Sequence, residues 1–143
     1  MNPGDYAGLC AFQDTYGIIG VTCDSDGKKY IVQGQGTFNE QADGYYDKVP
    51  VTENARVSEA LTSDEVTIKI EYDFSYTETA IKDLVNFYYS TDNGATWTKL
   101  GKQLKLTNNH LTVFMGARSY LFMYSTEQTG GYADFDYYKV YDK

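Results

Sequence analysis

The hydrophobic pattern of the chain is clearest over Val66–Phe74, where apolar and polar residues alternate without a break. A period of two is typical of a β-strand with one buried face. The apolar side chains of this run are predicted to face a core: Val66, Ile68, Ile70, Tyr72 and Phe74. Similar runs predict strands at Tyr6–Gln13, Gly17–Cys23, Lys29–Gln33, Val85–Ser90, Trp97–Leu100, Leu111–Phe114, Tyr120–Ser125 and Ala133–Tyr141. The last of these is rich in tyrosine and is predicted to close the fold.

Turn signals separate the predicted strands. They stand at Asp26-Gly27, Asp43-Gly44, Asn93-Gly94, Asn108-Asn109 and Gly130-Gly131. Many short strands with regular turns predict an all-β fold, an antiparallel β-sandwich of the jelly-roll kind. A chain of 143 residues has the size of one domain, so we expect a single sandwich over residues 1–143.

Two segments lack a clear period. Glu78–Leu84 has only a weak helical face and is predicted to form a loop or one turn. Gly34–Asp64 is largely polar, and we expect loops there with one or two short strands.

The net charge of the chain limits the classes of partner that it is expected to bind. Its net charge is −8, and its two arginines, Arg56 and Arg118, are far apart in sequence, so no basic stripe exists to bind phosphates. Nucleic acid and anionic membrane are therefore not expected as partners, and no apolar run approaches the roughly 20 residues of a membrane span. The residues from Met1 onward lack the pattern of a secretion signal. An acidic surface suits an extracellular, secreted protein that meets neutral ligands.

The chain has few residues that could bind a metal ion or form a disulfide. Cys10 and Cys23 lie in strand-like runs, which favours buried thiols over a disulfide, and the lone His110 completes no zinc ligand set. Asp134 and Asp136 would share one face of the last strand. They could contribute to a structural calcium site, but Ca²⁺ takes roughly six to eight oxygens, which favours solvated or hydrogen-bonded aspartates. No cofactor is expected.

The segment Ser90–Trp97 fits the pattern Ser-x-Asp-x-Gly-x-Thr-Trp, the Asp box. Asp92 is predicted to cap its own turn, Gly94 to take a positive φ, and Trp97 to fold back onto the hairpin. Trp97 could stack on a sugar, but a core position is favoured.

Catalytic machinery is not apparent. Glycoside hydrolysis needs two carboxylates at a set separation, and with 20 acidic residues some pair is inevitable. The chain has no nucleophile elbow, phosphate-binding glycine loop or metalloprotease helix. We therefore do not expect the chain to be an enzyme by itself.

Three segments together resemble the accessory β-sandwich that follows the catalytic propeller in family-43 glycoside hydrolases, the β-xylosidases and arabinofuranosidases. They are Gly4–Gln13 with Tyr16-Gly17, Tyr88–Trp97, and Phe114–Arg118 running on to Ala133–Tyr138. The resemblance implies a concanavalin A-like jelly roll in an extracellular enzyme of bacterial plant-wall digestion that acts on xylan or arabinoxylan.

The resemblance also shows two departures. In some members a loop aromatic helps to close the active site, but this chain has Met115 where the family has threonine and Arg118 at the place of the aromatic. In the family, several strands precede the segment that resembles Gly4–Gln13. We therefore expect a module cut from a larger multidomain enzyme, with a sheet edge or part of the core exposed, filled by residues of Gly34–Asp64, or paired with another copy.

Two functions follow. The first is a carbohydrate-binding module in which tyrosines, of which the chain has 15, stack on a neutral polysaccharide or oligosaccharide from the plant cell wall. Binding candidates are the residues beside the resembling motifs that alternate away from the core: Gln13, Tyr16, Arg118, Tyr120 and Tyr138. The second is a structural companion domain that stabilises or completes the catalytic domain of the parent enzyme without binding sugar.

Overall fold

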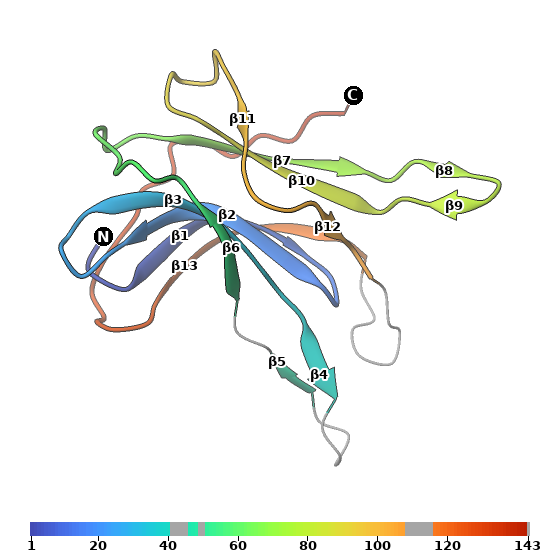
Figure 1. The fold of residues 1–143 in the computed structure, drawn as a ribbon, viewed down its shortest axis with the longest axis horizontal. Helices are drawn as coiled ribbons and strands as arrows, with labels where there is room; N and C mark the ends of the chain where they lie inside the picture. Colours follow the sequence, from blue (N-terminus) through green and yellow to red (C-terminus); the bar gives the residue numbers. More distant parts are fainter. Residues whose placement is uncertain (41–45, 49–50, 108–115, 143) are drawn as a thin grey trace.

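Two antiparallel β-sheets form the body of the molecule (Figure 1). The structure is a computed structural model that describes residues 1–40, 46–48, 51–107 and 116–142. The larger sheet has the strand order β13-β1-β2-β3-β6. Its strands are β1 (Asp5–Phe12), β2 (Tyr16–Cys23), β3 (Lys29–Gly36), β6 (Thr52–Arg56) and β13 (Arg118–Ser125). All adjacent strands within this sheet pair antiparallel.

The second sheet packs across the first. In it β10 (Leu84–Ser90) pairs with β7 (Thr67–Asp73), β11 (Thr98–Lys99) and β12 (Leu104–Lys105). Two small hairpins project from the body, β4 (Phe38–Glu40) with β5 (Tyr46–Lys48) and β8 (Tyr76–Thr77) with β9 (Ala80–Ile81). The described residues contain no helix, and so none with the length and apolar character of a membrane span. The predicted all-β antiparallel sandwich is confirmed.

The core lies between the two sheets, where their inward-facing side chains meet. Its fully buried members are Ala11, Ile19, Val85, Phe87, Leu104 and Leu106. Burial of each large apolar side chain stabilises the fold by about 1.5–3 kcal/mol. This cluster joins β1 and β2 to β10 and the β12 region, so it holds the layers together.

The alternation in Val66–Phe74 gives β7 as predicted, with corrections at its two ends. Val66 precedes the strand and is not one of the described side chains that pack against the core cluster. Ile68, Ile70 and Tyr72 pack against the core cluster. Phe74 does not face the core, since it is 53% exposed and stacks on Tyr72 with 5.2 Å between ring centroids. The strand ends at Asp73, so the alternation of faces no longer fixes the direction of the next side chain.

Most of the other predicted strands are present. Those at Tyr6–Gln13, Gly17–Cys23, Lys29–Gln33, Val85–Ser90, Trp97–Leu100 and Tyr120–Ser125 correspond to β1, β2, β3, β10, β11 and β13. The described part of Gly34–Asp64 contains the end of β3 and three short strands, β4, β5 and β6, more regular structure than predicted. Glu78–Leu84 holds β9 and the start of β10 instead of a loop alone. The predicted strand Leu111–Phe114 and His110 lie outside the described residues.

The Asp-box hairpin forms as predicted. Asp92 accepts hydrogen bonds from the Ser90 hydroxyl at 2.6 Å and from the amide and hydroxyl of Thr96 at 2.9 and 2.6 Å. These bonds, the one from Ser90 first, lower the pKa of Asp92 to about 2. Gly94 has φ of 85°, and a Cβ atom there would lie 3.5 Å from the Trp97 ring. The motif is therefore a structural turn.

The core position predicted for Trp97 is wrong. Its ring is 36% exposed, and the Lys69 ammonium lies 4.4 Å from the ring centroid. Lys69 also lies 4.7 Å from the ring centroid of Tyr88, on the outward face of the second sheet. A cation held over two aromatic rings replaces burial at this position.

The two cysteines are buried thiols, as predicted, and are not joined by a disulfide. Cys10 packs with Ile18 on the face of the larger sheet that points away from the second sheet, called here the outer face. Cys23 is on β2, and by strand parity its side chain lies on the opposite face of the sheet from that of Cys10. Burial raises the pKa of the Cys23 thiol. Geometry therefore separates the two sulfurs.

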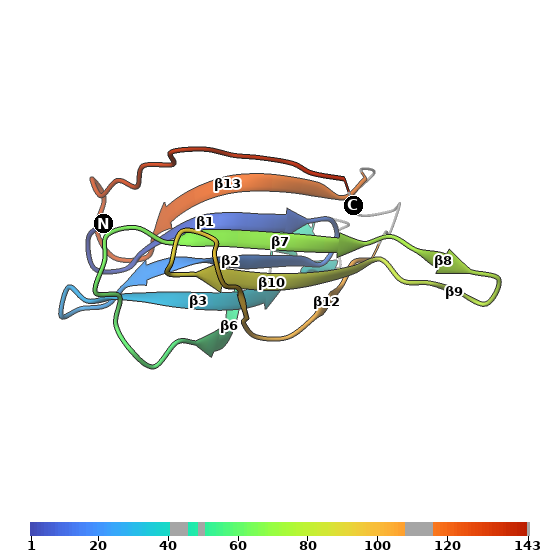
Figure 2. The same ribbon diagram turned by 90° about the horizontal axis from the view of Figure 1, so that it is seen from above.

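The strand predicted at Ala133–Tyr141 is wrong. Residues 126–142 follow β13 as an extended segment, called here the tail, which pairs with no described strand. It runs beside β13, at the level of β7 (Figures 1 and 2). Most of its large side chains are exposed: Tyr132, Phe135, Tyr137, Tyr138, Val140 and Tyr141. An alternating sequence allows a strand, but a ladder also needs a neighbouring strand to bond with.

The neighbouring edge of the sandwich is open. Leu121 and Met123 on β13 pair with Leu9 and Ala7, so they point toward the second sheet. They are nevertheless 43% and 37% exposed. Among the strands that the structure describes, the second sheet ends at β7 and does not cover them, in accord with the expectation of an exposed sheet edge. The described part of Gly34–Asp64 does not fill this position, because β6 pairs at the opposite edge of the larger sheet.

Candidate binding groove

The outer face of the larger sheet carries a groove of about 360 Å³. The five strands of this sheet and their flanking residues supply its lining: Tyr6, Ile18, Val32, Gly34, Val51, Glu53, Tyr124 and Thr126. By strand parity these strand residues point away from the second sheet, so the groove is separate from the core between the sheets.

Glycines keep this face hollow. Gly8 and Gly20 lie opposite each other on adjacent strands. A Cβ atom on Gly20 would lie 2.1 Å from the Ala7 carbonyl oxygen, a clash with backbone. A Cβ atom on Gly34 would lie 2.4 Å from Cγ1 of Val51. The outer face is thus shaped by residues that cannot carry a side chain without a shift of their neighbours.

An aromatic wall borders the groove on the β13 side. The rings of Tyr6 and Tyr124 stack with centroids 5.1 Å apart and 7° between their planes. Phe122 stacks behind Tyr124 at 5.8 Å. Burial, followed by the neighbouring Tyr6, Tyr16 and Glu53, raises the pKa of Tyr124 to about 12. Tyr124 therefore keeps its hydroxyl proton at neutral pH and can donate a hydrogen bond.

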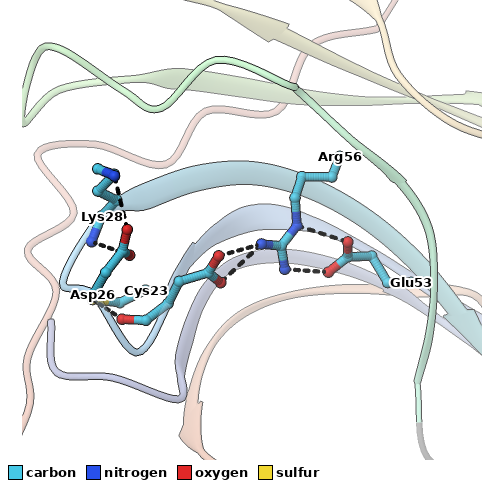
Figure 3. A network of polar contacts seen from close by, with 6 residues as sticks. Cys23, Asp26, Lys28, Glu53 and Arg56 are labelled. Carbon is cyan, nitrogen blue, oxygen red and sulfur yellow. Dashed lines mark hydrogen bonds and ion pairs between the residues drawn. The ribbon is translucent and has the colours of Figure 1, made fainter.

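An acidic wall borders the other side (Figure 3). Arg56 donates to both carboxylate oxygens of Glu53, from Nε at 2.9 Å and from NH2 at 3.0 Å. Its NH1 donates to both oxygens of Asp24 at 2.8 and 2.7 Å. The guanidinium also lies 5.2 Å from the ring centroid of Tyr30. These hydrogen bonds, that with Glu53 first, raise the pKa of Arg56, so it remains charged.

A second hollow lies on the other sheet and has a different character. Its lining residues are Glu71, Tyr72, Asp73, Phe74 and Asn86. Lys69 lies 3.0 Å from Glu71, and Lys82 lies 3.2 Å from Asp73. Hydrogen bonds from Ser75, followed by that from Lys82, lower the pKa of Asp73. A glycosidase acid needs a raised pKa, so Asp73 does not fit that role.

Four of the predicted binding residues gather around Phe12. Tyr16 and Tyr120 each lie 5.9 Å from the Phe12 ring between centroids, and Arg118 pairs with Phe12 in the register of β1 and β13. Gln13 follows directly in the chain and is buried. Tyr16 is only 1% exposed, so it can support a ligand site but offers almost no surface of its own.

Tyr138 stands apart from this group, because it lies in the tail. Tyr138 and Tyr120 are exposed, and the binding role of all five residues stays a prediction. Asp134 and Asp136 also lie in the tail, and the described residues hold no cluster of three His, Cys, Asp or Glu side chains suited to a metal ion. Calcium binding likewise stays a prediction.

Sequence reasoning missed the principal residues of the groove, Tyr6, Glu53 and Tyr124. The strands of Tyr6 and Tyr124 were predicted, and both residues fall on the same parity as the outer-face Phe12 and Tyr120. Glu53 lies in the segment with the weakest pattern, and no sequence signal places it opposite two tyrosines.

Comparison with known proteins gives a consistent family. Residues 1–141 match the model of the β-xylosidase C-terminal concanavalin A-like domain. A solved structure, described as a GH43 glycoside hydrolase engineered to display both endo-xylanase and exo-arabinofuranosidase activity, shares 29% identity over 92% of this chain with a TM-score of 0.78. A second, described as bifunctional GH43-CE from Bacteroides eggerthii, shares 39% identity over 92% of this chain with a TM-score of 0.69.

The chain spans 25% and 14% of the length of these two structures, so it corresponds to one part of each. Comparison with curated proteins gave no match.

Proposed function

Since the chain belongs to the family of β-xylosidase C-terminal concanavalin A-like domains, an accessory part of GH43 enzymes, we propose that it is a non-catalytic carbohydrate-binding module. It holds neutral plant cell-wall polysaccharide, xylan or another hemicellulose, for an attached glycoside hydrolase. The observation that carries this proposal is the groove on the outer face of the larger sheet.

The groove has the chemistry that sugar binding requires. A pyranose presents apolar C–H faces and a rim of hydroxyl groups, so its site needs an aromatic surface and hydrogen-bonding groups beside it. Tyr6 is backed by Tyr124 and can offer its other ring face, while Glu53 and Thr126 supply oxygen atoms across the groove. Stacking of Tyr6 on Tyr124 holds this wall in place, which lowers the entropy cost of binding.

Binding without hydrolysis is supported by the acidic wall. Glu53 is the only carboxylate among the described lining residues, and Arg56 binds both of its oxygens. A carboxylate that accepts hydrogen bonds from a guanidinium on both oxygens stays ionised, so it cannot act as the protonated acid of a glycosidase. The substrate class is carried over from the endo-xylanase and exo-arabinofuranosidase activities named for the similar structure. Since such polysaccharides lie outside cells, the proposal includes an extracellular location.

Affinity electrophoresis tests this function directly. The chain is run through gels that contain xylan, arabinoxylan, xyloglucan or β-glucan, and we expect at least one polysaccharide to retard it. Tyr6→Ala and Tyr124→Ala should weaken retention about tenfold, because each removes part of the stacking wall. Tyr76→Ala is the matched control on the β8–β9 hairpin, where the ring is exposed, and should leave retention unchanged. Retention that is absent, or equal in all variants, would contradict the proposal.

The candidates around Phe12 receive the same test. Loss of retention in Tyr120→Ala, with Tyr6→Ala unaffected, would move the site along the outer face toward Arg118. Tyr138→Ala examines the tail in the same gel.

The open edge favours a second candidate function, a companion domain that stabilises or completes the catalytic part of a parent enzyme. Leu121 and Met123 form an exposed apolar strip on β13, and the tail runs beside this strand (Figure 2). Because the similar structures are several times longer, the catalytic part of the same polypeptide is the proposed cover. In a full-length enzyme, Leu121→Ser with Met123→Ser should lower the thermal midpoint, the temperature at which half of the catalytic activity is lost. An unchanged midpoint would contradict this role.

Self-association is the alternative cover for this edge. Sedimentation velocity of the 143-residue chain distinguishes it, because pairing of copies would appear as a concentration-dependent increase in sedimentation coefficient. The same double variant would remove that increase.

A further inference from the structure

The charges around the groove are unequally distributed. Among the eight described residues that line it, Glu53 alone is charged. The nearest arginine, Arg56, has all three guanidinium nitrogens bonded to Glu53 and Asp24 (Figure 3). Two carboxylates and one guanidinium leave a net charge of −1 on this wall. The wall therefore offers hydrogen-bond acceptors and a negative potential, with its cation already engaged.

We propose that this arrangement makes the groove select neutral sugar chains against chains that carry uronic acid groups. The proposal rests on carbohydrate binding at the groove and names the class of polysaccharide it takes. Arg56 acts as a positioning residue, because it holds Glu53 in place and leaves no free donor pair for a ligand carboxylate. The acidic wall thus discriminates by repulsion as well as by hydrogen bonding.

Hydrogen bonding to neutral sugars depends on the fixed direction of Glu53. Each carboxylate oxygen can accept about two hydrogen bonds, and Arg56 uses one on each. The remaining acceptor sites can take sugar hydroxyls. The fork of two parallel bonds orients the carboxylate in a way that a single ammonium group cannot. Arg56 is itself held by Asp24 and by the Tyr30 ring, so the orientation extends back into the β2–β3 turn.

Repulsion of acidic sugars follows from the partly exposed position of the wall. The side chains of Glu53 and Asp24 are 33% and 37% exposed, so solvent and salt weaken their field without removing it. A ligand carboxylate about 4 Å from Glu53 would meet a like charge that weakens binding by about fivefold or more. This discrimination should decrease as ionic strength rises.

Calorimetric titration tests the inference with two ligands of equal length, a linear neutral xylo-oligosaccharide and one that bears a single glucuronic acid branch. At low salt we expect the wild type to bind the neutral ligand at least about fivefold more tightly, with a smaller ratio at high salt. Glu53→Gln should abolish the preference, because it removes the repelling charge and frees donors of Arg56. Arg56→Lys should weaken binding of the neutral ligand several-fold, because the fork on Glu53 is lost.

Two further variants separate charge from folding. Asp24→Asn removes one negative charge from the wall without changing a lining residue, so it should lower the preference while the circular dichroism spectrum stays unchanged. Asp64→Asn is the matched control, since Asp64 is an exposed carboxylate paired with Lys29 outside the groove. It should leave both affinities as in the wild type.

The outcomes distinguish this inference from the function on which it rests. If the wild type binds neither ligand, the groove is not a sugar site and both proposals fail. If it binds both equally at low salt, or if Glu53→Gln leaves the ratio unchanged, the selectivity is overturned while carbohydrate binding stands.

Discussion

The outer face of strands β1 and β2 and the inner face of the edge strand β13 are both rich in apolar side chains, but only the outer face of β1 and β2 is closely packed. Cys10, Tyr16 and Ile18 are buried there, with Val51 packed against them. Leu121 and Met123 of β13 are left exposed. The outer face packs its own side chains together, whereas the inner face of β13 would need another strand beyond β7.

The difference separates two kinds of surface. A groove whose walls are fixed by stacking and by a bidentate ion pair is preformed and suits a small polar ligand. An apolar strip without fixed neighbours suits a protein cover, because its main source of binding energy is removal of apolar area from water. The two proposals therefore use separate surfaces of the domain, one face for a polysaccharide and another edge for the catalytic part of a parent enzyme.

The largest expected contrast comes from truncation of one apolar residue on each surface. Ile18→Ala should lower the free energy of unfolding by about 2–5 kcal/mol, because it leaves a cavity in a packed cluster. Leu121→Ala should cost less than about 1 kcal/mol, since its side chain is already partly in water. Urea denaturation measures both. Equal losses would mean that the edge is as well packed as the outer face.

Glycine substitution gives the next contrast. Gly20→Ala should cost about 1–3 kcal/mol because its new methyl group meets the Ala7 carbonyl. At Gly116, which leads into β13, a Cβ atom would meet nothing within 4 Å, so Gly116→Ala should change stability by less than about 0.5 kcal/mol. Thermal unfolding of the two variants, compared with the wild type, measures both changes in stability. A tolerated Gly20→Ala would show that the β1–β2 spacing is not set by glycine.

A smaller effect is expected where the second sheet contacts β13. The Tyr72 hydroxyl lies 2.7 Å from Ser119 Oγ and donates to the Arg118 carbonyl at 3.2 Å. Tyr72→Phe should therefore cost about 0.5–1.5 kcal/mol and increase amide exchange in β13. Tyr76→Phe, on an exposed ring, is the control. Unchanged exchange in β13 would mean that this hydroxyl does not anchor the strand.

The smallest effect is confined to the Asp-box hairpin, which lies outside both surfaces. The pKa of Asp92 is about 2, below its ordinary 3.8, so its stabilising bonds are fully present above about pH 4 and are lost as pH falls toward 2. Trp97 is the only tryptophan, and its fluorescence should change over this range. In Asp92→Asn the acid-dependent change should be absent. A change of equal size in that variant would assign it to another group.

The sequence predicted the individual strands better than it predicted which segments pair with one another. Alternation over Val66–Phe74 fixes which side chains of a strand share a face, and β7 follows from it. Ala133–Tyr141 also begins with alternating apolar and polar residues, but no described strand bonds to it, so it remains extended. Strand propensity is local, whereas pairing depends on what lies beside the segment.

The groove was less predictable for a related reason. Tyr6, Glu53 and Tyr124 come from distant parts of the chain, and their approach depends on the order of strands β13-β1-β2-β3-β6. Parity could place the two tyrosines on one face, but not the irregular β3–β6 pairing that brings Glu53 near them. For Trp97 the local prediction was right and the tertiary one was wrong. The Asp box predicted the turn correctly, but it did not predict that the Trp97 ring is exposed.

Chemical-shift mapping tests the central claim most directly. A ¹⁵N-labelled chain is titrated with a neutral xylo-oligosaccharide. Perturbed amides should cluster around the groove, at Tyr6, Gly34, Glu53 and Thr126, with the inner face of β13 and the tail unchanged. Perturbations confined to Leu121, Met123 and the tail, or no perturbation at saturating ligand, would contradict the assignment of the groove as the sugar site.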